Sequence, residues 1–100
     1  MPWRSCARAR DVVVGAQPDV VLLHSVAVLR RLGARITRYD ADAGTAEARL
    51  RRFTRPALVR VRVEAAGAEA SRLSVESDAL VWTLLFRRFR GDLLLLERQA

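Results

Sequence analysis

The sequence predicts an α+β fold in which an antiparallel sheet packs against two helices in two layers. The chain has 100 residues, 51% of them hydrophobic, which is enough for one core and too little for two. Two segments repeat apolar residues at helical spacing, and the four segments between them alternate apolar and polar residues. We expect the order β-α-β-β-β-β-α in one domain over residues 1–100, with residues 1–5 frayed and the long C-terminal helix lying across the sheet.

The first two elements are a strand and a helix. The β-branched run at 12–14 predicts a strand that ends at Gly15. Pro18 and Asp19 open a helix, because proline suits the first helical position and a carboxylate there faces the positive end of the dipole. The helix stops at Gly33. One arc of it is predicted to be buried: Val21, Leu22, Ser25, Val26, Val28, Leu29 and Leu32.

The next four segments alternate with a period of two, which predicts a meander of four strands. They cover residues 36–39, 45–52, 58–64 and 72–77. The Asp-rich segment 40–44 is a turn in which Gly44 takes a positive φ. The inward residues of the last three strands are Ala46, Ala48, Leu50, Val59, Val61, Val63, Leu73 and Val75.

The register of the last hairpin follows from this pattern, because inward residues must face inward residues. Val61 is then opposite Val75, and Val63 is opposite Leu73. The same register places Glu64 opposite Arg72 and Arg60 opposite Glu76, which are two favourable pairs on the outward side.

The last segment, residues 79–98, is a long amphipathic helix with Ser77 or Asp78 as its N-cap. Gly91 lies on its outward side. Its buried stripe comprises Trp82, Phe86, Phe89, Leu93 and Leu96, with Leu85 beside them.

This order of elements resembles the β-α-β4-α unit of the TATA-binding-protein-like fold, which helix-grip proteins and several small bacterial domains share. The resemblance rests on the 12–14 strand, the helix ending Leu32-Gly33, the Asp-rich turn, the Val59–Val63 strand and the final Trp-Phe-Phe helix. It covers nearly the whole chain but includes no diagnostic motif. It implies a curved sheet that grips the C-terminal helix, and it implies no particular function.

Composition limits the partners and the compartment. The formal net charge is +7 and all 18 basic residues are arginines, a bias typical of a GC-rich genome and therefore weak support for nucleic acid. The single Cys6 and the single His24 exclude an internal disulfide and a zinc site within one chain. No segment approaches the roughly 20 apolar residues of a membrane span, and no signal-peptide cleavage site is present. We expect a cytoplasmic protein with no metal and no membrane partner.

Candidate catalytic residues are few. We place His24, the candidate general base, on the solvated side of its helix without a nucleophile beside it. Asp40 and Asp42 resemble part of a calcium loop, but the bidentate Glu of such a loop is missing. The five glycines are dispersed, so the sequence has no phosphate-binding loop. We expect no enzyme activity, no catalytic residue and no cofactor.

One candidate functional surface is the outward side of the predicted sheet. Its arginines form a candidate nucleic-acid face: Arg49, Arg51, Arg60, Arg62 and Arg72. Nucleic-acid binding is therefore one alternative function. We favour a ladder of Arg–Glu pairs instead, because the same strands carry Glu47, Glu64 and Glu76. Tyr39 is the one candidate for an outward aromatic on which a base could stack.

The second candidate surface consists of apolar residues that lie off the buried arcs of the two helices. These candidate interface residues are Val20, Leu23, Ala27, Val81, Leu84 and Leu95. In addition, one helical face cannot bury four consecutive leucines at 93–96. Exposed apolar surface of this kind marks an interface, so we expect a homodimer or a complex with another protein.

Our main interpretation is a small, non-catalytic interaction domain that associates with itself. A further alternative is a carrier of a small apolar ligand between the sheet and the C-terminal helix. It depends on the inward Ala46, Ala48 and Ala57, which are small enough to leave a cavity. Close packing of the final helix against these alanines is the other explanation of their size.

Overall fold

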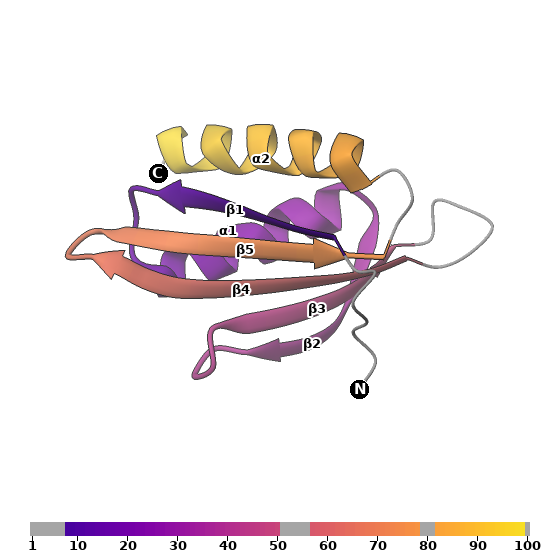
Figure 1. Cartoon of the computed structure of the whole chain (residues 1–100), viewed down its shortest axis with the longest axis horizontal. Coiled ribbons are helices and arrows are strands. Elements are labelled where there is room, and N and C mark those ends of the chain that lie inside the picture. Colours follow the sequence, from indigo (N-terminus) through magenta and orange to yellow (C-terminus); the bar gives the residue numbers. More distant parts are fainter. Residues whose placement is uncertain (1–7, 51–56, 79–81, 100) are drawn as a thin grey trace.

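The computed structural model describes residues 8–50, 57–78 and 82–99, and they form two layers (Figure 1). The elements are β1 (Arg8–Val14), α1 (Pro18–Arg31), β2 (Ala34–Asp40), β3 (Thr45–Leu50), β4 (Ala57–Gly67), β5 (Ala70–Ser77) and α2 (Trp82–Gln99). The predicted α+β class and the predicted order are both confirmed. Residues 1–5, which we expected to be frayed, lie outside the described residues.

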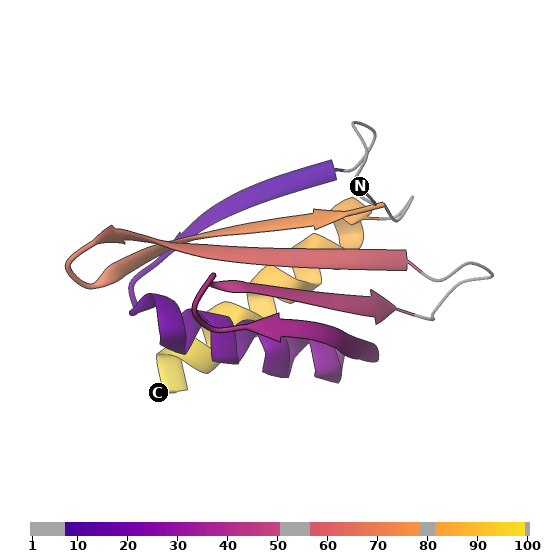
Figure 2. The same cartoon turned by 90° about the horizontal axis from the view of Figure 1, so that it is seen from below.

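The sheet is antiparallel throughout, with the strand order β1-β5-β4-β3-β2. The first strand therefore pairs with the last one, and β1 and β2 form the two edges. Figures 1 and 2 show both helices on the same face of the sheet. We call the opposite face, over which no described helix lies, the outer face.

The core lies between the sheet and α1, which contacts β2, β3, β4 and β5, while α2 packs against α1 and β1. Every residue of the arc predicted for the first helix is buried, and so are all the predicted inward residues of β3, β4 and β5. From α2, Phe89 and Leu93 enter the core completely, and Phe86 and Leu96 are partly buried against it. Hydrophobic burial on one face of each element thus holds the two layers together.

The predicted register of the last hairpin is confirmed. Val61 pairs with Val75, and Val63 with Leu73, on the helix-covered face. On the outer face Glu64 pairs with Arg72. Arg60 likewise pairs with Glu76. A slip of two residues would have set arginine against arginine, which is unfavourable.

A β-bulge interrupts β2 between Ile36 and Arg38. It inserts Thr37 as an extra residue, so every later residue of the strand changes face. Arg38 then pairs with Glu47 on the outer face, and Tyr39 pairs with the buried Ala46 on the helix-covered face. A bulge also disfavours pairing of this edge strand with another chain.

The expected N-cap of the second helix, Ser77 or Asp78, stays a prediction, because residues 79–81 lie outside the described residues. Ser77 is the last residue of β5, and α2 is described from Trp82. The Asp78 carboxylate accepts a hydrogen bond of 2.8 Å from the backbone N–H of Leu58 in β4. The carboxylate at this position therefore satisfies a strand amide.

The turn between β2 and β3 requires glycine. Asp40 Oδ1 accepts a hydrogen bond of 3.1 Å from the Ala43 N–H, as expected for a turn-capping aspartate. Gly44 has a φ of 70°, and its carbonyl accepts a hydrogen bond of 2.8 Å from the Val63 N–H. A Cβ at position 44 would lie only 2.6 Å from the carbonyl oxygen of Val63. Both the left-handed backbone and this close approach exclude a side chain.

Gly44→Ala should lower the free energy of unfolding by about 1–3 kcal/mol, since the alanine must adopt a positive φ against a backbone oxygen. The matched control is Gly91→Ala, because Gly91 is exposed in α2 and a Cβ there meets nothing within 4 Å. That control should raise stability by up to about 1 kcal/mol. Urea denaturation measures both, and a Gly44→Ala protein as stable as the parent would contradict this account of the turn.

Candidate functional site

Of the residues that the sequence suggested for catalysis or metal binding, the structure describes His24, Asp40 and Asp42. His24 is half-buried on α1, whereas we had expected it to be solvated, and Cys6 lies outside the described residues. Within the described ranges, no group of three or more His, Cys, Asp or Glu side chains could hold a metal ion. Neither α1 nor α2, as far as described, is long and apolar enough to cross a membrane. The absence of enzyme activity stays a prediction.

The outer face carries most of the charge of the sheet. Its arginines and carboxylates are Arg35, Arg38, Arg49, Arg60, Arg62, Arg72, Asp11, Asp40, Glu47, Glu64 and Glu76. Of the candidate nucleic-acid residues, Arg49, Arg60, Arg62 and Arg72 do share this face, and Arg51 lies outside the described residues. The structure thus brings the predicted basic residues together, but it intersperses them with acids.

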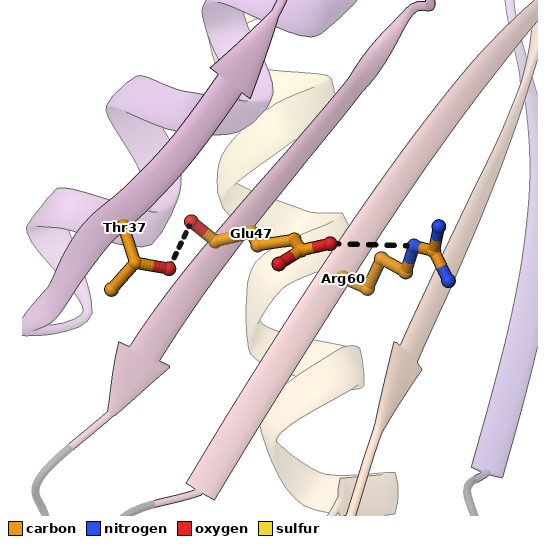
Figure 3. A network of polar contacts seen from close by, with 3 residues as sticks. All are labelled: Thr37, Glu47 and Arg60. Carbon is orange, nitrogen blue, oxygen red and sulfur yellow. Dashed lines mark hydrogen bonds and ion pairs between the residues drawn. The ribbon is translucent and has the colours of Figure 1, made fainter. Parts of the chain in front are cut away.

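Glu47 occupies the centre of this charged network (Figure 3). Its Oε2 lies 3.8 Å from Arg60 Nε across the β3–β4 ladder. Its backbone carbonyl accepts a hydrogen bond of 3.3 Å from the hydroxyl of Thr37, the extra residue of the bulge. On the β2 side the register places Arg38 opposite Glu47. One carboxylate therefore lies between two arginines of neighbouring strands.

A second ion pair joins two residues of the same strand. Arg62 Nη1 lies 4.0 Å from Glu64 Oε1, and the register also places Glu64 opposite Arg72. Exposed pairs of this kind contribute about 0–1 kcal/mol each. Their arrangement matters more than their energy, because carboxylates near these guanidinium groups repel a phosphate backbone.

The sequence interpretation missed two arginines of the outer face. Arg35 was not included in the candidate face because the predicted strand began at residue 36, whereas β2 begins at Ala34. Arg38 was not included because simple alternation from Ile36 places it on the helix-covered face. Only the bulge places it on the outer face. The bulge also corrects the position of Tyr39, the only aromatic residue in the described strands, which lies on the helix-covered face. The described outer face therefore offers no ring for base stacking.

Two open clefts lie among these charged residues. One, of about 420 Å³, is lined by Gly33, Arg35, Ile36, Thr37 and Arg49. The other, of about 460 Å³, is lined by Arg38, Asp40, Ala43, Thr45, Glu47, Arg60, Arg62 and Glu64. Neither is an enclosed space between the layers, where Ala46, Ala48 and Ala57 are almost completely buried. The structure thus adds no support for a carrier of apolar ligands.

Three leucines of the described helices are exposed, and we call them the leucine patch: Leu23, Leu94 and Leu95, which are 58%, 36% and 51% exposed. Leu23 lies in the second turn of α1, and the other two lie in the last two turns of α2. The start of α1 and the end of α2 lie at the same end of the molecule (Figures 1 and 2). The exposed leucines therefore gather at one end of the helical layer.

The other predicted interface residues are divided. Ala27 is exposed, and Val20 is half-buried. Val81 and the side chain of Leu84 lie outside what the structure describes. Among the four consecutive leucines, the first is fully buried and the last is partly buried, so the helix does leave the middle two outside the core.

Comparison with known proteins shows similarity in fold. No protein-family model matches the sequence, and no curated protein matches it. A solved chain of the adenylate sensor from AMP-activated protein kinase, in complex with 5-aminoimidazole-4-carboxamide 1-beta-D-ribofuranotide (ZMP), matches with a TM-score of 0.68. The match covers 82% of this chain and 93% of that chain at 17% sequence identity. An identity this low establishes similarity of fold alone.

This match corrects the expected resemblance to the TATA-binding-protein-like and helix-grip folds, because the similar structure comes from the kinase sensor. The expectation rested on the order of elements, which fixes the class of fold but leaves the positions of the helices open. The helix-grip resemblance implied a sheet that grips the C-terminal helix. In the structure α1 contacts four strands, and α2 packs against α1 and β1.

We expect this chain to bind nucleic acid only weakly and without sequence preference. If each candidate arginine neutralised one phosphate, log K would fall with log salt by about 0.9 per contact. Because Glu47 and Glu64 already pair with arginines of this face, we predict that retention on DNA disappears near physiological salt.

The test is the double variant Arg60→Gln, Arg62→Gln in a DNA retention assay with a salt series. It should lose up to about 1 kcal/mol of stability for each broken pair, while its residual DNA retention stays almost unchanged. Sub-micromolar binding by the parent at physiological salt that collapses in the variant would establish the nucleic-acid face instead.

Proposed function

We propose that this chain is a non-catalytic interaction domain that associates with a second copy of itself through the leucine patch. The observation that carries this proposal is the exposure of Leu23, Leu94 and Leu95 at one end of the helical layer. Exposed apolar surface on a small domain is a marker of a contact with another protein. The outer face, with its Arg–Glu pairs, is by contrast a surface suited to water.

The charges at the rim of the patch favour a second copy as the partner. Asp19 is exposed in the first turn of α1, and Arg98 is exposed in the last turn of α2. A two-fold axis through the patch makes every contact reciprocal. If Asp19 of one copy lies beside Arg98 of the other, Arg98 of the first copy also lies beside Asp19 of the second. A rim that includes both a carboxylate and a guanidinium suits a contact between two identical copies, and an apolar centre with a polar rim is the usual anatomy of an interface.

The similarity to the kinase sensor supports a binding role over a catalytic one. The match covers 93% of the sensor chain, so nearly all of that chain shares this fold. A domain of this kind therefore occurs in a protein that senses a ligand.

Net charge opposes self-association and gives it a distinctive salt dependence. Two copies with a formal charge of +7 each repel one another at long range. The Debye length falls from about 30 Å at 0.01 M salt to about 8 Å at 0.15 M. Because contact between leucines is far less sensitive to salt than this repulsion, the dimer should become stronger as salt is raised. The salt response of a complex held by ion pairs is the opposite.

Light scattering at tens of micromolar and physiological salt should report a dimer for the parent. The variant Leu23→Glu, Leu95→Glu should be monomeric, since it places a charge in the apolar centre of each half of the contact. The matched control is Val13→Glu, which alters an apolar residue that is 60% exposed on the outer face of β1. This control should remain dimeric.

Three results would contradict the proposal. The parent protein could be monomeric at this concentration, or the double variant could be as dimeric as the parent. In the third result only the Val13→Glu variant loses the dimer. That result would show that the contact lies at the β1 edge of the sheet.

A further inference from the structure

The charges of the outer face follow a pattern with one exception. Along the ladders Arg38 faces Glu47, Glu47 faces Arg60, and Arg60 faces Glu76. At the other end of β3, however, Arg35 faces Arg49. On its second side Arg49 faces Leu58, which is apolar. Two arginines therefore lie opposite each other, whereas every other cross-strand pair of charged residues in the described sheet is favourable.

Within the described ranges the register places no carboxylate opposite either arginine of this pair. In the described part of the chain, no acidic side chain forms an ion pair with either arginine. Glu47 is two residues away on β3, but its carboxylate is paired with Arg60. Directly opposite residues have Cβ atoms about 4.5–5.5 Å apart, so like charges there destabilise the sheet. A site that opposes stability in this way is a candidate for binding.

The arginine pair also lies in a cleft. Both side chains line the open cleft of about 420 Å³ beside the start of β2, together with Gly33, Ile36 and Thr37. Its volume lies within the range of small-molecule sites, about 300–1,000 Å³, and exceeds what a bare inorganic anion needs. In the last turn of α1, just before Gly33, Arg30 and Arg31 offset the negative end of the helix dipole. These two arginines therefore oppose the negative potential of the helix end that precedes the cleft.

We propose that Arg35 and Arg49 form a binding site for a small, soluble phosphate monoester. A monoester dianion carries a charge near −2 at neutral pH, which matches two guanidinium groups, whereas a carboxylate leaves one of them uncompensated. Each guanidinium presents a planar fork of N–H donors that suits phosphate oxygens. The remaining volume of the cleft accommodates the organic part of the ester. This site is separate from the leucine patch and does not depend on self-association.

The matched control comes from the same face. Arg38 and Arg72 each face a glutamate, so Arg38→Gln, Arg72→Gln removes the same total charge as Arg35→Gln, Arg49→Gln. Isothermal titration calorimetry with glycerol 3-phosphate, at constant ionic strength, compares both double variants with the parent. Two further titrations use other sources of phosphate. One uses inorganic phosphate, and the other uses phosphatidylcholine vesicles that contain phosphatidic acid. Far-ultraviolet circular dichroism checks folding, and the single variants replace a double variant that does not fold.

The proposal predicts saturable binding of glycerol 3-phosphate by the parent and by the control, with affinity at least ten-fold lower in Arg35→Gln, Arg49→Gln. Without ligand, that variant should unfold at the same temperature as the parent or higher, because a repulsion is removed, whereas the control should unfold at a lower temperature. Equal loss of affinity in both variants would show a general effect of charge and overturn the site. Binding to the vesicles without binding of either soluble phosphate would overturn it as well.

Discussion

The pairing of β4 with β5 is the constraint on which the rest of this structure depends. Its register sets valine and leucine against each other on one face and arginine against glutamate on the other. Because side chains alternate strictly along a strand, a slip by one residue would exchange the two faces completely. β1 and β3 then extend the hairpin on either side. β3 keeps the same division, whereas β1 places Val12 and Val14 on the helix-covered face but also the exposed Val13 on the outer face. The apolar face requires a cover, and α1 and the inner stripe of α2 supply it.

This division separates two surfaces with different chemistry. The outer face is a charged network in which Glu47 joins neighbouring strands (Figure 3), and its one mismatch is a pair of arginines beside a cleft. In the described part of the helical layer Leu22, Leu29 and Leu93 are buried, whereas Leu23, Leu94 and Leu95 are exposed. Hydrocarbon surface favours contact with another apolar surface, whereas the arginine pair favours an anion. The exposed leucines and the arginine pair therefore lie on different faces of the molecule and have different chemistry.

Most of the fold could be predicted because its determinants are local and periodic. The buried arc of α1 follows from helical spacing between Val21 and Leu32, and the hairpin register follows from the alternation of two strands and the charges opposite them. The bulge in β2 could not be predicted, since no residue near Thr37 signals an extra position. The predicted outer face was therefore incomplete and partly wrong, because the bulge decides on which face Arg38 and Tyr39 lie. The use of Asp78 was also missed, as its partner Leu58 is distant in the chain.

The proposed self-association requires that the chain contacts its partner through the helical layer and that the outer face of the sheet remains in water. A dilution series of ¹H–¹⁵N correlation spectra tests this directly, because amide shifts report where a contact forms. Between millimolar and low micromolar concentrations, the amides of Leu23, Leu94 and Leu95 should move together along one binding curve. Those of Val13 and Arg62, on the outer face, should stay in place. Shifts confined to the outer face or to the β1 edge, or spectra that do not change with concentration, would contradict it.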